Sequence, residues 1–508
     1  MQLVQAKQDE SVFRNLAGID PRDSSTYGEY YRLARALAMQ QEDLIGEIRS
    51  AGLRGREGAG LPVADSWQLC LEQAQAEKYL ICHACDTHPQ ATVIRTLLAS
   101  NPHAVLEGML ICAYAVGATK IFLYLDRTDR SGIELVTAAI SQMAANRLVG
   151  AGISKVSFCW NIEVVEGEAS LICSESTALI QAMEGNLPMA GRMPPHPEVC
   201  GYLGKPTLVH SAETLAHVSA ILQEGSAWYA ALGSKHCSGT KLLAVTGSIQ
   251  KPGVIEVAMG TTLRSIIYDS CGGLLENREC KFLWVGGPAG GCISAAHMDT
   301  ALEYETLEEM EVIMGSGSII VYDQTACAVE VAKECLVVCQ QESCGKCVLC
   351  REGTYQMQEI LADMTTGKSR ANDRDLLLEL IQAVKKGSLC SLGKAAVNPV
   401  STLLKHFDDE VEAHMKRKKC PALVCKKYVT FHILPEKCTG CSACREACPE
   451  EAIEGDDGLI HVIDTTVCTK CGTCLDICRS VAAAVVKAGA IKPATPKQPI
   501  AVGAWKRR

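Results

Sequence analysis

Eight cysteines between residues 438 and 478 constrain the chain more than any other feature of its sequence. They form two copies of one spacing, C-x2-C-x2-C-x3-C: Cys438, Cys441, Cys444 and Cys448, then Cys468, Cys471, Cys474 and Cys478. Three thiolates spaced in this way converge on three corners of one four-iron cluster, whereas the fourth cysteine of the run points to the other cluster. We therefore predict two 4Fe-4S clusters in this segment, which implies transfer of single electrons.

The exchange of fourth cysteines defines two predicted ligand sets. The first is Cys438, Cys441, Cys444 and Cys478, and the second is Cys468, Cys471, Cys474 and Cys448. A zinc site or a disulfide framework is the alternative, but zinc takes paired C-x2-C units and would leave the repeat unexplained. Pro449 follows the first run whereas Arg479 follows the second, so we expect the surroundings of the first cluster to differ.

Composition indicates a cytoplasmic protein of several domains. A length of 508 residues corresponds to three to five domains of roughly 100 to 200 residues each. The segment Met1 to Arg49 has no basic-then-apolar signal pattern, so the 28 cysteines are expected to stay reduced. The apolar stretch from Met109 to Leu125 is interrupted by Lys120 and falls short of a membrane span of ~18 residues. A net charge of -9 argues against a nucleic-acid partner.

A further group of cysteines lies earlier in the chain. The segment ESCGKCVLCREGT contains Cys344, Cys347 and Cys350, and Cys390 follows some 40 residues later in SLCSLGKAAVNP. Three clustered thiols and one distant thiol predict a third 4Fe-4S cluster, although C-x2-C-x2-C also occurs in zinc proteins. The intervening segment has apolar residues at helical spacing, which places this cluster in a small helical bundle.

These motifs resemble those of the NADH-binding flavoprotein subunit of respiratory complex I and, more closely, its relatives in multi-subunit NAD(P)-linked hydrogenases and formate dehydrogenases. The segment ESCGKCVLCREGT is similar to the family's E-S-C-G-x-C-x-P-C-R-x-G, and the appended two-cluster region, with the preceding KKCPALVC, is similar to hydrogenase-type members. The resemblance extends from about Ala51 to Val485. It implies a multidomain α/β fold.

The resemblance also implies an order of domains. An N-terminal helical segment (1–50) precedes a flavoprotein-like α/β domain (51–236) and a β-grasp, or SLBB-like, domain (237–322). A helical 4Fe-4S domain (323–415), a bacterial-type two-cluster ferredoxin domain (416–485) and a flexible tail (486–508) follow. Short alternating apolar runs separated by Gly and Pro between Lys241 and Ile267 agree with strands in the third of these segments.

The glycine-rich loop departs from the family pattern. The family reads G-R-G-G-A-G-F-P-x-G-x-K-W, in which bare backbone approaches the cofactor and the lysine neutralises phosphate. In this chain Glu57 replaces a glycine, Leu61 the aromatic residue and Ser66 the lysine. The negative charge gained at Glu57 and the positive charge lost at Ser66 both oppose binding of an anionic phosphate. The loop residues that the resemblance still assigns to the cofactor are Gly55, Arg56, Gly58 and Gly60.

Other cofactor motifs also depart from the family pattern. The family's N-A-D-E-x-E-P-G corresponds to residues 83–90, where the asparagine and the first acid are lost, and C-G-E-E-T-A corresponds to residues 173–178, which keep one acid of the pair. His196 replaces the aromatic residue of P-P-F-P, and His210 and Ser211 replace the asparagines of V-N-N-x-E-T. The residues that the resemblance still assigns to FMN or NAD(P) here are Asp86, Glu175 and Thr177.

Simpler structural interpretations accompany these assignments. Arg56 and Glu57 could pair with each other on the loop surface, and the scattered histidines 83, 88 and 210 are more often structural than ligands. Cys335 and Cys339, four residues apart, are expected as core thiols. Cys420 and Cys425 lie close to the ferredoxin-like region, and contact with a cluster or a partner is the less favoured interpretation.

The sequence thus predicts an iron-sulfur electron-transfer subunit of a soluble hydrogenase-like or formate dehydrogenase-like complex, with three 4Fe-4S clusters and a degenerate FMN and NAD(P) pocket. The alternative is an active diaphorase subunit, in which FMN takes a hydride from NAD(P)H near Glu175 and could bifurcate the electrons. A structural adaptor ranks last, because it would not need a chain of clusters. Expected partners are a thioredoxin-like 2Fe-2S subunit, since the first cysteine here is Cys70, a catalytic subunit, and ferredoxin. Direct membrane insertion is not expected.

Overall fold

The computed structural model describes residues 3–4, 12–13, 19–28, 30–150 and 160–506. Two compact units make up the chain. The first unit comprises Met1–Asp323, Cys335–Gln356 and Glu379–Thr402, and the second comprises Gln324–Glu334, Met357–Leu378 and Leu403–Arg508. Helices α12, α13 and α14 each contribute residues to both units.

A four-stranded parallel sheet is the framework of the first unit. Its order is β4-β3-β2-β5, and the strands are β2 (Tyr79–Ala84), β3 (Lys120–Asp126), β4 (Ile162–Gly167) and β5 (Thr207–Ser211). Alternate side chains enter different cores, because successive residues of a strand point to opposite faces. Leu80 and Leu123 pack in the larger core, whereas Ile81 and Phe122 pack in the smaller one. The sheet is therefore buried on both faces, as parallel sheets usually are.

Helices pack on this sheet and on one another. They are α3 (Val63–Leu71), α4 (Val93–Ser100), α5 (Pro102–Val116), α6 (Arg130–Ala145), α7 (Ser176–Met183), α8 (Ala212–Glu224) and α9 (Ser226–Ala231). The central helix, α5, is buried along almost its whole length and begins where Asn101 accepts a hydrogen bond from the Ala104 amide. It packs closely on α8, since a Cβ at Gly108 would lie 1.9 Å from the Leu215 carbonyl oxygen.

The N-terminal helices belong to the same core. Helix α1 (Tyr31–Leu37) packs on α5, and α2 (Gln41–Ala51) places Leu44, Ile45 and Ile48 in the larger core of the parallel sheet. Strand β1 (Leu3–Val4) instead pairs with β7 of the second sheet. The segment 1–50, predicted as separate and helical, therefore joins both sheets, although part of it lies outside the described residues.

A six-stranded mixed sheet follows in the order β1-β7-β6-β10-β8-β9. Its other strands are β6 (Thr240–Gly247), β7 (Gly253–Ala258), β8 (Cys280–Val285), β9 (Gly291–Ser294) and β10 (Ser318–Asp323). Strand β10 runs parallel to β6 and antiparallel to β8, while β6 and β7 are antiparallel. Two short helices, α10 (Leu263–Ser265) and α11 (Tyr304–Glu309), contribute Leu263 and Leu307 to its core.

A run of helices follows the mixed sheet. They are α12 (Ala328–Gln341), α13 (Val348–Thr366), α14 (Asp373–Gly387), α15 (Ser391–Ala395), α16 (Asn398–His406) and α17 (Asp408–Met415). Helix α14 has Asp373 and Asp375 in its first turn and Lys385 and Lys386 in its last, which complements the helix dipole. Among the described residues, no helix combines the length and apolar character that crossing a bilayer requires.

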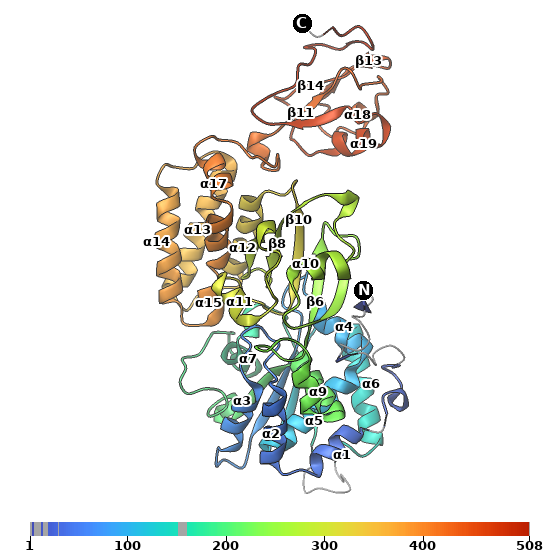
Figure 1. The fold of residues 1–508 in the computed structure, drawn as a ribbon. Helices are drawn as coiled ribbons and strands as arrows, with labels where there is room; N and C mark the ends of the chain where they lie inside the picture. Colours follow the sequence, from blue (N-terminus) through green and yellow to red (C-terminus); the bar gives the residue numbers. More distant parts are fainter. Residues whose placement is uncertain (1–2, 5–11, 14–18, 29, 151–159, 507–508) are drawn as a thin grey trace. The chain divides into compact units, whose positions relative to one another are not determined.

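A small module of short strands and two helices ends the chain (Figure 1). Its elements are β11 (Thr430–Ile433), α18 (Ala443–Glu446), β12 (Ile453–Glu454), β13 (Leu459–Ile460), β14 (Val462–Ile463), α19 (Thr473–Val481), β15 (Val485–Ala488) and β16 (Ile500–Ala501). The antiparallel pairs are β11 with β15, β12 with β14 and β13 with β16.

The final segment differs from the predicted flexible tail (486–508). Strand β16 pairs with β13 so that Ile500 lies opposite Ile460, and Trp505 packs against the core of the module. A two-residue strand leaves no periodic pattern in a Pro- and Ala-rich segment, so the sequence did not reveal it. Up to residue 506, the end of the chain is part of the terminal module.

Candidate metal centres and cofactor loop

The cysteines of the helical segment converge on one cavity. Cys344, Cys347, Cys350 and Cys390 line one cavity together with Ile172 and Ala190 from the parallel-sheet region. Cys344 and Cys347 precede α13, Cys350 lies in its first turn, and Cys390 caps the start of α15. The structure thus brings together the four cysteines grouped in the sequence.

Hydrogen-bond donors point at the sulfurs of this cavity. The Leu389 amide donates to Cys347 Sγ and the Gly393 amide to Cys390 Sγ, each at 3.4 Å. The hydroxyl of Ser343 lies 3.5 Å from Cys350 Sγ. Donors to sulfur favour the charged thiolate, and in clusters they help to set the reduction potential.

Burial dominates the acidity of these thiols. It raises the pKa of Cys350 and of Cys390 above the ordinary value. Cys347 and Cys344 add to the shift of Cys350, and Glu175 and Cys344 add to that of Cys390. A buried anion needs a compensating charge. The four thiols of this cavity would be stabilised as thiolates by the positive charge of iron.

The terminal module contains two further cavities. Cys438, Cys441, Cys444 and Cys478 line one of them, and Cys448, Cys468, Cys471 and Cys474 line the other. Each cavity takes three cysteines from one run and its fourth from the other. The residues grouped by spacing in the sequence are thus the residues that meet in space.

The two module cavities share the same chemistry. The Ala452 amide donates to Cys448 Sγ at 3.4 Å, and the Ala484 amide donates to Cys478 Sγ at 3.3 Å. Burial raises the pKa of Cys444 to about 12 and that of Cys474 to about 11, and nearby thiols reinforce both shifts. Four sulfurs, amide donors and apolar walls fit a 4Fe-4S cluster in each.

The surroundings of the module cavities differ, as the residues after each run suggested. Pro449 stops the helix after the first run, so α18 is only four residues long. Arg479 continues the helix after the second run, and α19 extends to Val481. His461 and Ser442 line the first cavity, whereas Glu450 lines the second.

In the glycine-rich loop, residues 55–60, the backbone adopts conformations that favour glycine. Gly60 has a φ of +63°, and a Cβ there would lie 2.5 Å from the Tyr304 ring. Gly58 has a φ of +132°, and a Cβ there would lie 3.2 Å from the Gly315 Cα. In both cases, the groups that approach the bare backbone belong to the protein itself.

Arg56 does not pair with Glu57 on the loop surface. Its side chain is buried and donates hydrogen bonds to Tyr229 Oη at 3.0 Å and to the Ser238 carbonyl oxygen at 2.8 Å. Its backbone amide donates to Thr214 Oγ1 at 2.8 Å. The guanidinium is therefore an internal structural group with protein acceptors.

Glu57 instead turns towards the start of α8. Its carboxylate accepts hydrogen bonds from Thr214 Oγ1 at 2.9 Å and from Ser211 Oγ at 3.4 Å. Ser211 is also the N-cap of α8, so the negative charge lies at the positive end of the helix dipole. Desolvation acts to raise the pKa of Glu57, but the contacts with His210 and Thr214 outweigh it and lower the pKa to about 2.

His210 completes this contact. Its Nε2 accepts a hydrogen bond from Trp67 Nε1 at 3.0 Å, which places the proton of a neutral ring on Nδ1. Nδ1 lies 3.8 Å from the Glu57 carboxylate. His210 and Ser211, which replace the two asparagines of the family motif, thus both face the carboxylate of Glu57.

The remaining cofactor candidates have structural contacts. Asp86 accepts from the amides of Ile94 and Arg95 at 2.9 and 3.0 Å, at the start of α4. Glu175 caps α7 by accepting from the Ala178 amide at 2.9 Å, and Thr177 accepts from the Gly191 amide at 2.6 Å. Burial raises the pKa of Asp86 to about 6.

None of the contacts described for His83 and His88 joins them to His210. The ring of His83 stacks on Tyr124 with centroids 6.0 Å apart, and His88 lies beside Ser318 at 3.4 Å. A Cβ at Gly287 would lie 2.6 Å from His88 Nε2. His88 is therefore packed against the glycine-rich turn of the second sheet.

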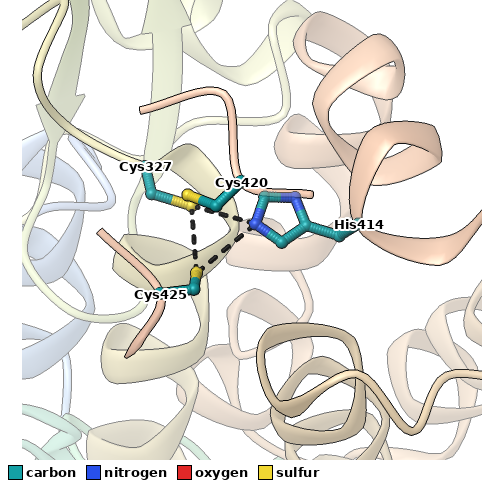
Figure 2. Close-up of side chains that lie close together, drawn as sticks. All are labelled: Cys327, His414, Cys420 and Cys425. Carbon is teal, nitrogen blue, oxygen red and sulfur yellow. Dashed lines mark hydrogen bonds between the residues drawn. The ribbon is translucent and has the colours of Figure 1, made fainter. Parts of the chain in front are cut away.

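One group of potential metal ligands is not evident from the sequence. Cys327, His414, Cys420 and Cys425, hereafter the Cys3His group, lie together in the second unit (Figure 2). The spacing C-x4-C of Cys420 and Cys425, six residues after a histidine, was the available signal. Cys327 lies 98 residues before Cys425, so no local pattern connects the two.

Three protein families match the chain. Residues 48–220 match the Nuo51 FMN-binding domain, residues 330–414 match the NADH-ubiquinone oxidoreductase-F iron-sulfur binding region, and residues 430–505 match a 4Fe-4S dicluster domain. The third match includes strand β16 and Trp505, in agreement with the folded terminal segment.

Individual proteins are similar over most of their lengths. The NADP-reducing hydrogenase subunit HndC of Solidesulfovibrio fructosivorans is 39% identical over 90% of this chain and 93% of its own. A subunit of the NADH-quinone oxidoreductase of Rhizobium meliloti is 32% identical over 81% of this chain and 98% of its own. A crystal structure of NAD+-reducing NiFe-hydrogenase in the H2-reduced state has a TM-score of 0.73 at 29% identity, covering 82% of this chain and 68% of that chain.

Proposed function

The chain belongs to the NADH-ubiquinone oxidoreductase-F family, whose members include hydrogenase subunits, and it is an electron-transfer subunit of an oxidoreductase. Within this family we propose that it carries three 4Fe-4S clusters and has lost the flavin and nucleotide sites. The observation that supports this proposal most directly is the contrast between complete cysteine sets and an internally occupied glycine-rich loop.

The cysteine cavities support the first part of the proposal. Each has four sulfurs and amide donors to sulfur, and together their walls are formed mainly by apolar and small side chains. Bound 4Fe-4S clusters supply one-electron redox chemistry. The chain's own residues hold the sulfurs in place, donate hydrogen bonds to them and limit access of water.

The position of Glu57 supports the second part. Its carboxylate accepts hydrogen bonds from the hydroxyl groups at the start of α8. A cofactor phosphate at this place would need donors of the same kind. Two unit charges 4 Å apart repel by about 4 kcal/mol at an effective dielectric constant of 20. A phosphate beside Glu57 would meet this repulsion and would lack the lysine that Ser66 replaces. The residues present do not fit FMN.

The alternative function is an active FMN-containing diaphorase subunit. The match of residues 48–220 to an FMN-binding domain favours it, as does the retention of Gly58, Gly60 and Glu175. Glu175, however, already caps α7 and accepts a hydrogen bond from Thr177. We therefore rank this function second.

The experiment that separates the two functions is quantification of iron and flavin in anaerobically purified protein. We expect about 12 iron atoms and no flavin per chain. One FMN per chain would overturn the loss of the flavin site, and a value near eight or four irons would overturn the cluster count.

A pair of substitutions tests the cause of flavin loss. Glu57→Gly with Ser66→Lys removes the carboxylate and restores a cation, and we expect FMN to bind if only the phosphate site is damaged. Glu57→Gln with Ser66→Lys is the matched control, because it removes the charge but keeps the side-chain volume. FMN binding by the unaltered protein with equal affinity would contradict the role given to Glu57.

Partner subunits complete the proposal. HndC and the relative in Rhizobium meliloti are named as subunits of larger enzymes, which supports a multi-subunit complex for this chain. We propose that a 2Fe-2S thioredoxin-like subunit and a catalytic hydrogenase or dehydrogenase subunit, with ferredoxin as a further redox partner, exchange electrons with it. The parallel central pair of β6 and β10, flanked by antiparallel β7 and β8, supports a β-grasp domain between residues 237 and 322.

A further inference from the structure

A buried hydroxyl lines the cysteine cavity of the helical segment. It belongs to Ser388, in the turn between α14 and α15, and the residue is only 5% exposed. Its Oγ has no hydrogen-bond partner among the residues that the structure describes. Such groups are few in native proteins, and a redox role is one recognised reason for them. The position of this hydroxyl, at a set of predicted cluster ligands, points to that reason.

The backbone around Ser388 is fixed on both sides. The Ser388 amide donates to the Val384 carbonyl oxygen at 3.0 Å, which ties the residue to the end of α14. The next amide, that of Leu389, donates to Cys347 Sγ at 3.4 Å, and Cys390 follows as a predicted ligand. The hydroxyl therefore projects from a segment that is held by α14 on one side and by the cysteine set on the other.

Gly393 brings the hydroxyl and a ligand sulfur to the same place. A Cβ at Gly393 would lie 3.0 Å from Ser388 Oγ and 3.4 Å from Cys350 Sγ. Gly393 lies within α15, where the backbone conformation suits other residues, so the space available rather than the conformation favours glycine. The bare backbone thus keeps the serine oxygen and the cysteine sulfur close to each other without a side-chain carbon between them.

The other polar side chains that line this cavity, apart from the cysteines, already have partners. Lys346 Nζ donates to the Ala190 carbonyl oxygen at 2.7 Å. Ser343 Oγ accepts from the Gly345 amide at 3.4 Å. Among the described residues that line the cavity, Ser388 alone has a side-chain oxygen or nitrogen without a hydrogen-bond partner. Its hydrogen is therefore available to a group bound between the four cysteines.

We propose that the Ser388 hydroxyl donates a hydrogen bond to a sulfur of the 4Fe-4S cluster in this cavity, next to Cys350, and thereby raises the reduction potential of that cluster. This inference rests on the proposed function, which assigns a cluster to the cavity. Reduction adds one electron to the cluster, breaks no bond in the chain and leaves the hydroxyl its proton. A donor to sulfur stabilises the reduced form more than the oxidised form, because the reduced form carries one more negative charge. The hydroxyl thus makes this cluster easier to reduce than the backbone amides alone would.

The first test is a redox titration of the full chain, followed by electron paramagnetic resonance. The signal of this cluster is the one that Cys390→Ala removes. We expect Ser388→Ala to lower its midpoint potential, with iron content and the potentials of the other clusters unchanged. Ser388→Thr keeps a hydroxyl and should lie nearer to the unaltered protein. Ser391→Ala is the matched control, because Ser391 is an exposed serine of α15 that directly follows Cys390, and it should leave the potential unchanged.

A second measurement detects the proton itself. Electron-nuclear double resonance of the reduced cluster should show an exchangeable-proton coupling that Ser388→Ala lacks and Ser391→Ala keeps. An unchanged potential in Ser388→Ala with full iron would overturn the inference, and so would an equal shift in Ser391→Ala. Loss of iron from Ser388→Ala would also contradict it, because the hydroxyl would then have a structural role. Absence of the third cluster from the unaltered protein would instead contradict the proposed function, so the two failures are distinguishable.

Discussion

The cysteine cavities and the glycine-rich loop differ in what their polar groups face. In the cavities, burial raises the pKa of Cys350 and Cys444, and nearby sulfurs increase the shift. In the loop, Arg56 and Glu57 are both satisfied by neighbouring protein groups. Sites within one family framework can thus diverge: the cysteine sets keep thiols that face one another, whereas the loop side chains have become part of the fold.

The strongest test of this contrast removes one cavity cysteine. Cys390→Ala should lose one cluster, about 4 of about 12 irons per chain, because the remaining three sulfurs cannot complete the site. Cys339→Ala is the control, since Cys339 lines the same cavity from α12 but lies outside the predicted ligand set. Iron analysis and electron paramagnetic resonance of the reduced protein provide the measurement. Loss of four irons from Cys339→Ala instead would reassign the ligand.

A second test asks whether Arg56 has become structural. Arg56→Met should destabilise the first unit by roughly 3 kcal/mol, because it leaves buried acceptors on Tyr229 and Ser238 without donors. Iron content should not change. Arg127→Met is the control: Arg127 forms an exposed pair with Glu168, and its loss should cost less than about 1 kcal/mol. Thermal unfolding of both variants is the measurement. An unchanged melting midpoint in Arg56→Met would instead favour a role for Arg56 in ligand binding.

The smallest expected effect is a dependence of stability on pH. Burial lowers the pKa of His83 to about 4, although the charge of Glu57 opposes the shift. The unfolded chain takes up this proton near pH 6.5, so stability is present above that pH and is lost as pH falls towards 4. His83→Gln should lose less stability than the unaltered protein between pH 7 and 5.5, by about 1 kcal/mol.

The measurement for His83 is the melting midpoint at both pH values, with the cluster absorbance monitored to exclude loss of iron. His236→Gln serves as a control, because His236 is exposed in the loop before β6. An identical pH dependence in the unaltered protein and His83→Gln would show that the ring of His83 is not held neutral. The loop region would then be more open to water than its contacts indicate.

The family resemblance was predictable from the sequence and is confirmed, and so are the multidomain α/β fold with its flavin-binding-type domain and the ferredoxin-like module. Short-range spacing carried this information, because a cluster imposes a strict rhythm on the cysteines that hold it. The same rhythm grouped Cys448 and Cys478 with the opposite runs, and these are the cavities that they line.

Other features depend on tertiary contacts that leave no local pattern. The partners of Arg56, Tyr229 and Ser238, lie more than 170 residues away, so the expected pairing with Glu57 was wrong. Cys327 joins His414 only because α12 and α17 meet through Glu410. The strand Ile500–Ala501 was also missed, since its two residues pair with Leu459–Ile460, some 40 residues earlier in the chain.

The exchanged cysteines of the terminal module have a consequence for how such a module can be divided or inherited. A cut between the two runs would give halves with three of the four sulfurs each needs, because Cys448 lines one cavity and Cys478 the other. Neither half could act as a one-cluster ancestor of the present form without acquiring a new thiol. The pair of centres is thus an indivisible unit of inheritance, gained or lost together when proteins of this kind are recombined.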